Sequence, residues 1–119
     1  MLIVDNYRKD WALRYLREAK VDLKIAEEAP ITAPNTIIEA LKKGQLALYY
    51  ILGEPNLIEE IVETESLNEK VDDPLLRFLL GVDKAVEGTL SLLGRNNKLM
   101  LNYANELLNL ISDIISLFT

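Results

Sequence analysis

Apolar residues recur at spacings of three and four along most of this chain, and nowhere do they alternate with polar residues over the length of a strand. Ala12, Leu16, Ala19, Leu23 and Ala26, for example, mark one stripe of a helix with about 3.6 residues per turn. Because alternation is typical of a half-buried strand, the pattern predicts an all-α fold. The chain has 119 residues, of which 50% are hydrophobic, so we expect one domain over residues 1–119.

Prolines, glycines and capping residues divide this pattern into five predicted helices. Thr36 and Glu39 have the spacing of a capping box, with Asn35 as an alternative cap, and Asp73 followed by Pro74 is a strong start signal. Two antiparallel hairpins joined by an acidic short helix predict a four-helix up-down bundle with an additional short helix. We expect helices over residues 5–28, 36–52, 56–63, 74–93 and 97–117, with residues 30–34 ending the first and a loop or frayed turn over 65–70.

Two features of these helices predict close packing. Gly44 lies inside the second predicted helix, where it costs about 1 kcal/mol relative to Ala, and a close helix crossing would explain it. The last helix, capped by Asn96 or Asn97, confines its polar residues to a stripe about 120° wide. A helix so apolar must be covered on more than one side, either at the centre of the bundle or at a subunit interface. We therefore expect a homodimer.

Histidine and cysteine are absent from the chain, which limits the chemistry available to it. Histidine is the usual proton carrier near neutral pH, and cysteine supplies thiolates and disulfides. The net charge is −6, and residues 54–73 alone hold eight acidic residues against one basic residue. Nucleic acid is therefore disfavoured as a partner, since a polyanion needs a basic surface.

The apolar residues do not indicate membrane insertion or export. The run at residues 1–4 is too short for a signal peptide, and no apolar stretch reaches about 18 residues without a polar interruption. We expect a cytoplasmic protein with no membrane partner.

One cluster of carboxylates could bind a metal ion. Glu59, Glu60 and Glu63 fall on one predicted helix, and Asp83 and Glu87 are one turn apart on the next. Hard cations such as Mg²⁺ prefer such oxygen ligands. The cluster resembles that of all-α nucleotide pyrophosphohydrolases of the MazG type, although the second pair lacks that family's E-x-x-D spacing. The simpler interpretation is a solvated acidic face, with no cofactor.

Two stretches of the chain resemble the HEPN family of helical nucleotide-binding proteins. Residues 15–26 are similar to the family's first helix in their alanine and Asp-Leu phasing, and residues 40–50 resemble its alanine-rich second helix. The order of the five predicted helices is also similar. The resemblance implies a helical bundle used for dimerisation, or for binding a partner protein, a nucleotide or RNA.

The catalytic motif of active HEPN proteins is broken in this chain. These proteins cleave RNA with an Arg-polar-x-x-x-His motif, for which Arg95 and Asn96 would supply the first two residues. The histidine should fall within positions 100–102, which hold Met, Leu and Asn. The resemblance therefore implies a non-catalytic member, with Arg95 and Asn96 as candidate nucleotide- or RNA-binding residues.

Taken together, the sequence predicts a non-enzymatic helical-bundle interaction module that forms a homodimer and can bind a protein or nucleotide partner. Two alternatives stay open: a Mg²⁺-dependent nucleotide pyrophosphohydrolase using the five carboxylates, and an RNA- or nucleotide-binding HEPN-like protein using Arg95.

Overall fold

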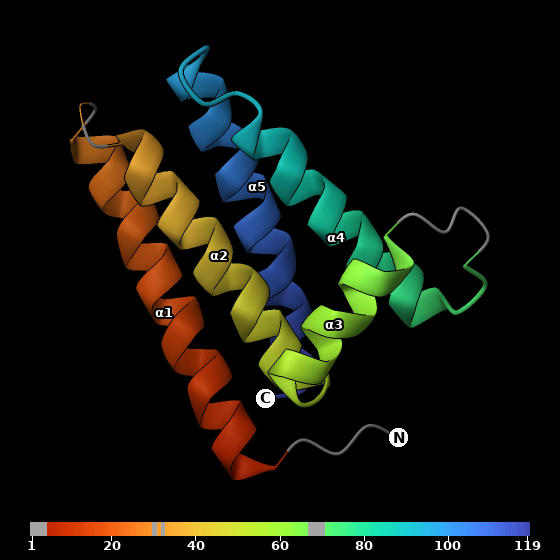
Figure 1. Ribbon diagram of the computed structural model, residues 1–119. Coiled ribbons are helices and arrows are strands. Elements are labelled where there is room, and N and C mark those ends of the chain that lie inside the picture. The colour runs from red at the N-terminus through yellow and green to blue at the C-terminus, as the bar shows by residue number, and fades with distance from the viewer. Residues whose placement is uncertain (1–4, 30, 32, 67–70) are drawn as a thin grey trace.

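The computed structural model describes residues 5–29, 31, 33–66 and 71–119, and five α-helices make up most of them. In chain order the helices are α1 (Asn6–Glu28), α2 (Ala33–Leu52), α3 (Pro55–Glu65), α4 (Pro74–Leu90) and α5 (Asn97–Ser116) (Figure 1). The predicted all-α fold, a helical bundle with an additional short helix, is confirmed. Residues 30 and 67–70, which the sequence assigned to a helix end and to a loop, lie outside the described residues.

Four helix starts among the described residues follow capping residues. Asp5, Glu54, Asp73 and Asn96 each precede a helix, and each side chain accepts a hydrogen bond from the backbone N–H three residues later, at 2.8 to 3.0 Å. These bonds satisfy N–H groups that have no partner inside the helix. The predicted Asp73 cap and Asn96 cap are therefore confirmed.

The predicted start of α2 at a Thr36 cap is wrong. The helix begins at Ala33, so Thr36 lies inside it, and Pro34 occupies the first turn. Proline is tolerated there because the first N–H groups of a helix have no intrahelical acceptor. Ala33 is buried and packs into the core, which favours starting the helix one turn early.

The predicted end of α4 at residue 93 is also wrong, because the helix ends at Leu90. The Ser91 hydroxyl donates to the Gly88 carbonyl at 2.6 Å, and the next N–H groups bond to carbonyls only three residues back. Gly94 then adopts a φ of 75°, which glycine reaches without strain. The other predicted boundaries differ from the structure by no more than two residues, α3 being slightly longer than expected.

The helices form a slab with principal extents of 42 × 34 × 20 Å. The α1–α2 hairpin is the most extensive contact, α5 packs along both of its helices, and α4 packs on α5 (Figure 1). Within the described chain, no Cα atom of α1 lies within 8 Å of a Cα atom of α4. The bundle is therefore open on the side of α4, where the fourth helix covers only part of its neighbour.

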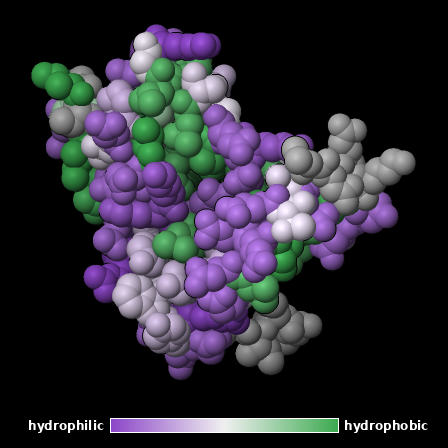
Figure 2. All heavy atoms as spheres, in the orientation of Figure 1, coloured by the Kyte–Doolittle hydropathy of each residue, from purple (hydrophilic) through white to green (hydrophobic). Residues whose placement is uncertain are grey.

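The core contains one continuous cluster of buried apolar side chains drawn from all five helices. The predicted stripe of α1, Ala12 to Ala26, is buried along its whole length. Gly44 lies at a close crossing of α2 and α5, as predicted, since a Cβ atom there would be 2.9 Å from Leu108 Cδ1. Hydrophilic side chains cover much of the face shown in Figure 2. Among the described residues, none of the helices is long and apolar enough to span a membrane.

Candidate interaction surface

One side of α5 stays exposed although large apolar side chains form it. Tyr103 and Leu110 of α5, and Leu117 directly after its last residue, are 45%, 44% and 76% exposed and recur at intervals of seven positions. Seven residues make nearly two turns, so the three side chains point in about the same direction. Leu107 and Ile114 complete a spacing of four and three along the same side. This spacing is typical of a helix that packs against another helix.

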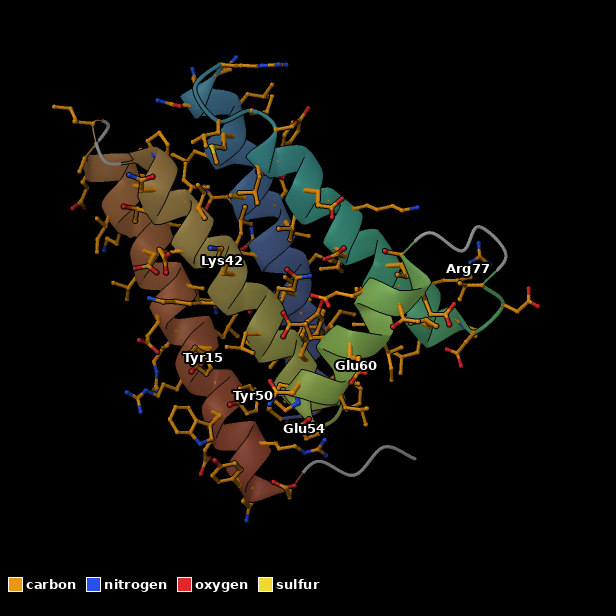
Figure 3. The ribbon with its side chains drawn as sticks, in the orientation of Figure 1. Tyr15, Lys42, Tyr50, Glu54, Glu60 and Arg77 are labelled. Atoms are coloured by element: carbon orange, nitrogen blue, oxygen red, sulfur yellow. The ribbon has the colours of Figure 1, made fainter. Side chains whose placement is uncertain are left out.

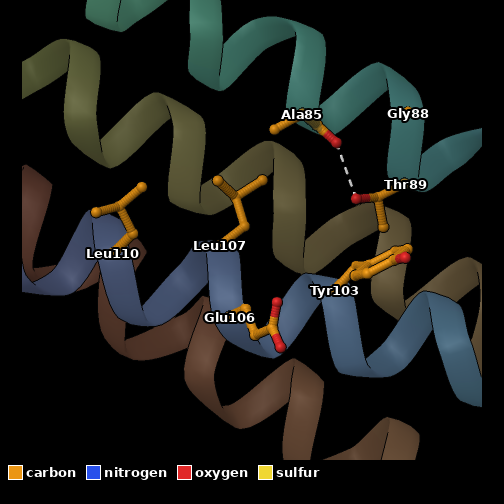
Figure 4. A pocket seen from close by; sticks show the side chains of 7 residues that line it. All are labelled: Ala85, Gly88, Thr89, Tyr103, Glu106, Leu107 and Leu110. Atoms are coloured by element: carbon orange, nitrogen blue, oxygen red, sulfur yellow. Dashed lines mark hydrogen bonds between the residues drawn. The ribbon is translucent and has the colours of Figure 1, made fainter.

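The exposed row borders a groove of about 450 Å³ between α4 and α5. Figure 4 shows it lined by Ala85, Gly88 and Thr89 of α4 and by Tyr103, Glu106, Leu107 and Leu110 of α5. The Thr89 hydroxyl donates a hydrogen bond of 2.8 Å to the Ala85 carbonyl on its own helix. The α4 wall of the groove therefore presents mainly carbon atoms to the solvent.

The α4 wall also has two glycines that the packing of a single chain does not explain. Gly81 and Gly88 are exposed inside α4, and a Cβ atom added to either would meet no atom of the described residues within 4 Å. Glycine inside a helix costs about 1 kcal/mol relative to alanine. No neighbour in the part of the chain that the structure describes requires this cost.

The outer edges of the groove carry charges of opposite sign. Arg77 and Lys84 are exposed and seven residues apart on α4, on the side where Gly81 and Gly88 lie. Figure 3 shows Arg77 pointing away from α2. Glu106 and Asp113 are exposed and seven residues apart on α5, next to Tyr103 and Leu110. We call Arg77 and Lys84 the basic edge, and Glu106 and Asp113 the acidic edge.

We use "α4–α5 face" for the apolar surface between these two edges. Its members are Gly81, Ala85 and Gly88 of α4, Tyr103, Leu107, Leu110 and Ile114 of α5, and Leu117, which directly follows α5.

Asp83, one of the five candidate metal ligands, takes part in a polar link between α4 and α2. The Gln45 side-chain amide donates hydrogen bonds to Asp83 Oδ1 at 2.8 Å and to the Tyr49 hydroxyl oxygen at 2.7 Å. The pKa of Tyr49 is raised to about 12, mainly by burial and then by the charge of Asp83, while the hydrogen bond from Gln45 opposes the shift. The link stabilises the contact of α4 with the bundle.

The other four candidate ligands remain on the surface. Glu59, Glu60 and Glu63 are exposed on α3 (Glu60 is labelled in Figure 3), and Glu87 is exposed on α4. The charges of Glu59 and Glu63 reach Tyr49 and raise its pKa. In the ranges that the structure describes, no three Asp or Glu side chains are grouped so that they could hold a metal ion. The magnesium alternative stays a prediction.

Arg95 and Asn96 lie in the exposed turn between α4 and α5. The Asn96 side chain accepts the Leu99 N–H at 3.0 Å, so its oxygen is engaged in capping α5. The Arg95 backbone N–H donates to the Leu92 carbonyl at 2.9 Å. A role of these two residues in nucleotide or RNA binding stays a prediction.

The aromatic residues of α1 pack beside an aromatic residue of α2. The ring centroids of Trp11, Tyr15 and Tyr50 lie 5.7 to 6.4 Å apart with nearly parallel planes (Tyr15 and Tyr50 are labelled in Figure 3). The Arg14 guanidinium lies 5.0 Å from the centre of the Trp11 ring. Burial, followed by the neighbouring Tyr15, raises the pKa of Tyr50. These contacts join α1 to α2.

Comparisons with protein-family models, with curated proteins and with solved structures gave no significant match. The resemblance to the HEPN family therefore stays a prediction.

Reasoning from the sequence missed the α4 side of the groove. Gly81 and Gly88, seven residues apart in a helix that continues through both, were the signal that could have revealed it. The apolar excess of α5, by contrast, was visible in the sequence.

Proposed function

We propose that this protein is a non-enzymatic interaction module that forms a homodimer through its α4–α5 face. The observation that carries the proposal is the exposed row of Tyr103, Leu110 and Leu117 beside a groove of about 450 Å³. Covering such side chains contributes about 25 cal/mol for each Å² of apolar surface removed from water.

The charges of the face favour a second copy as the occupant. An isologous interface places one surface against itself, so an acidic edge and a basic edge on the same surface can satisfy each other. A partner of one charge sign would oppose one of the two edges. Interface charges of this kind select partners more than they add affinity.

Two other groups of exposed apolar residues are smaller. Val21 and Ile25 are exposed on α1, but Lys20 and Lys24 flank them. Leu57 and Ile61 on α3 line a hollow of about 230 Å³ together with Glu60, Thr64 and Glu65. Both groups have fewer large side chains than the α5 row, and charged residues interrupt both.

The experiment is sedimentation velocity on the purified chain over a wide concentration range. We expect a dimer for the unaltered chain and a monomer for Leu110→Glu, since a buried unpaired carboxylate is costly. Val21→Glu is the matched control, with the same new charge on an exposed position of α1, and should remain a dimer. Circular dichroism should show equal helix content for all three proteins. A monomeric unaltered chain, or equal effects of the two substitutions, would contradict the proposal.

A further inference from the structure

We infer that the two copies are related by a two-fold axis parallel to α4 and α5, so that the basic edge of each copy lies against the acidic edge of the other. The inference rests on the proposed dimer and specifies its symmetry. It identifies four charged side chains that select a second copy as the partner.

Two limiting orientations of the axis bring the α4–α5 faces of two copies together. An axis perpendicular to the helices places α4 on the second copy's α4 and α5 on the second copy's α5. Arg77 and Lys84 would then face basic residues, and Glu106 and Asp113 would face acidic ones. An axis parallel to the helices places α4 on the second copy's α5, so that opposite charges meet. Like charges in contact across an interface cost several kcal/mol, which favours the parallel axis.

The levels of the charged residues along the helices agree with the parallel axis. Such an axis leaves positions along the helices unchanged, so distances can be measured from the turn that joins α4 to α5. At about 1.5 Å per residue, Lys84 lies about 9 Å from the C-terminus of α4 and Glu106 about 14 Å from the N-terminus of α5. Arg77 and Asp113 lie about 20 Å and about 24 Å from the same ends. Lys84 therefore differs in level from Glu106 of the second copy, and Arg77 from Asp113, by about 4 to 5 Å, which is within the reach of a lysine or arginine side chain.

The same axis also places large side chains over small ones. Tyr103 of one copy, about 9 Å from the N-terminus of α5, would lie over Ala85 and Gly81 of the second copy, about 8 Å and about 14 Å from the C-terminus of α4. The open space beside Gly81 would then be filled from outside the chain. Contacts of large with small residues let helices approach closely and pack without voids. The perpendicular axis would instead place the exposed apolar side chains of α5 against the same side chains of the second copy.

Charge reversal tests the orientation. We expect Lys84→Glu and Glu106→Lys each to weaken the dimer about tenfold, since each reversal creates a like-charged contact at both edges of the interface. The double variant Lys84→Glu/Glu106→Lys should return to within about threefold of the unaltered dissociation constant, because opposite charges face each other again. Lys24→Glu, an exposed reversal on α1, is the control and should leave the constant unchanged.

The outcomes separate this inference from the proposed dimer. A perpendicular axis predicts that Lys84→Glu does not weaken the dimer, since the substitution replaces one like-charged contact by another. If Leu110→Glu abolishes the dimer while the reversals leave it unchanged, the axis is wrong and the dimer stands. If the double variant is as weak as either single variant, the pairing of Lys84 with Glu106 of the second copy is wrong. A monomeric unaltered chain would remove both the dimer and the axis.

Discussion

Substituting Gly44 and Gly88 by alanine applies the same change to two helices with opposite surroundings. A Cβ atom at Gly44 would lie 2.9 Å from Leu108 Cδ1 and 3.6 Å from Ile111 Cδ1, in the buried crossing of α2 and α5. A Cβ atom at Gly88 would meet no atom within 4 Å among residues 5–29, 31, 33–66 and 71–119. We expect the two substitutions to change the free energy of unfolding in different directions or by clearly different amounts.

The magnitudes follow from two opposing effects. Alanine favours the helix over glycine by about 1 kcal/mol at either position. At Gly44 the new methyl group also forces Leu108 and its neighbours to move, and overpacking of a buried site costs about 1 to 3 kcal/mol. We therefore expect Gly44→Ala to be neutral or to destabilise the fold by up to about 2 kcal/mol. Gly88→Ala should stabilise it by about 1 kcal/mol and raise the melting temperature by about 4 °C.

Urea denaturation measures both effects. Each substitution is made in the Leu110→Glu background, so that dimer formation does not contribute to stability. The free energies of unfolding of the two variants should differ by at least about 1 kcal/mol. Equal stabilisation by both substitutions would show that α2 and α5 do not approach closely at Gly44, and would refute the packing described here.

Three further predictions follow from the polar groups. The free energy of unfolding should fall between pH 10 and about pH 12, because the pKa of Tyr49 is 10.0 in the unfolded chain and about 12 in the fold. The neutral Tyr49 contributes its full stabilisation below this range and loses it as the pH rises through the range. Tyr49→Phe should reduce the fall in denaturation experiments at a series of pH values. Asp22→Asn should remove the 2.9 Å ion pair with Lys43, a hydrogen-bonded contact that raises the pKa of Lys43. The free energy of unfolding in urea should fall by at most about 1 kcal/mol, because both side chains are partly exposed. Mg²⁺ with a panel of nucleotides should leave the melting temperature unchanged at millimolar concentration, whereas a clear rise would favour the pyrophosphohydrolase alternative.

The fold could be predicted from the sequence because local signals agree with its packing. The spacing of apolar residues identified the helices, and the carboxylate and amide caps placed several starts. The start predicted at Thr36 was wrong because the residues of a capping box can also occur inside a helix, where they do not mark its start. The turn after Leu90 was missed because its hydrogen bonds depend on Ser91 and on the following backbone, whose geometry the apolar spacing does not record.

The candidate surface could be predicted only in part. The sequence showed that α5 carries more apolar residues than one-sided burial needs, but not which of them stay exposed. That depends on how α4 docks, and the link from Gln45 to Asp83 that helps to position α4 joins residues 38 apart in the chain. The opposite charges of the two edges become visible only when α4 and α5 lie side by side.

The central claim is that a second copy covers the α4–α5 face, and intermolecular paramagnetic broadening tests it most directly. The chain has no cysteine, so Asn109→Cys provides a single exposed site on α5 for a nitroxide label. Labelled chain is mixed with unlabelled, ¹⁵N-enriched chain, so that only contacts between copies broaden the amide signals. We predict broadening on α4 around Arg77, which lies at the level of residue 109, and none on α1. An unbroadened spectrum at high concentration, or broadening centred on Val21, would contradict the claim.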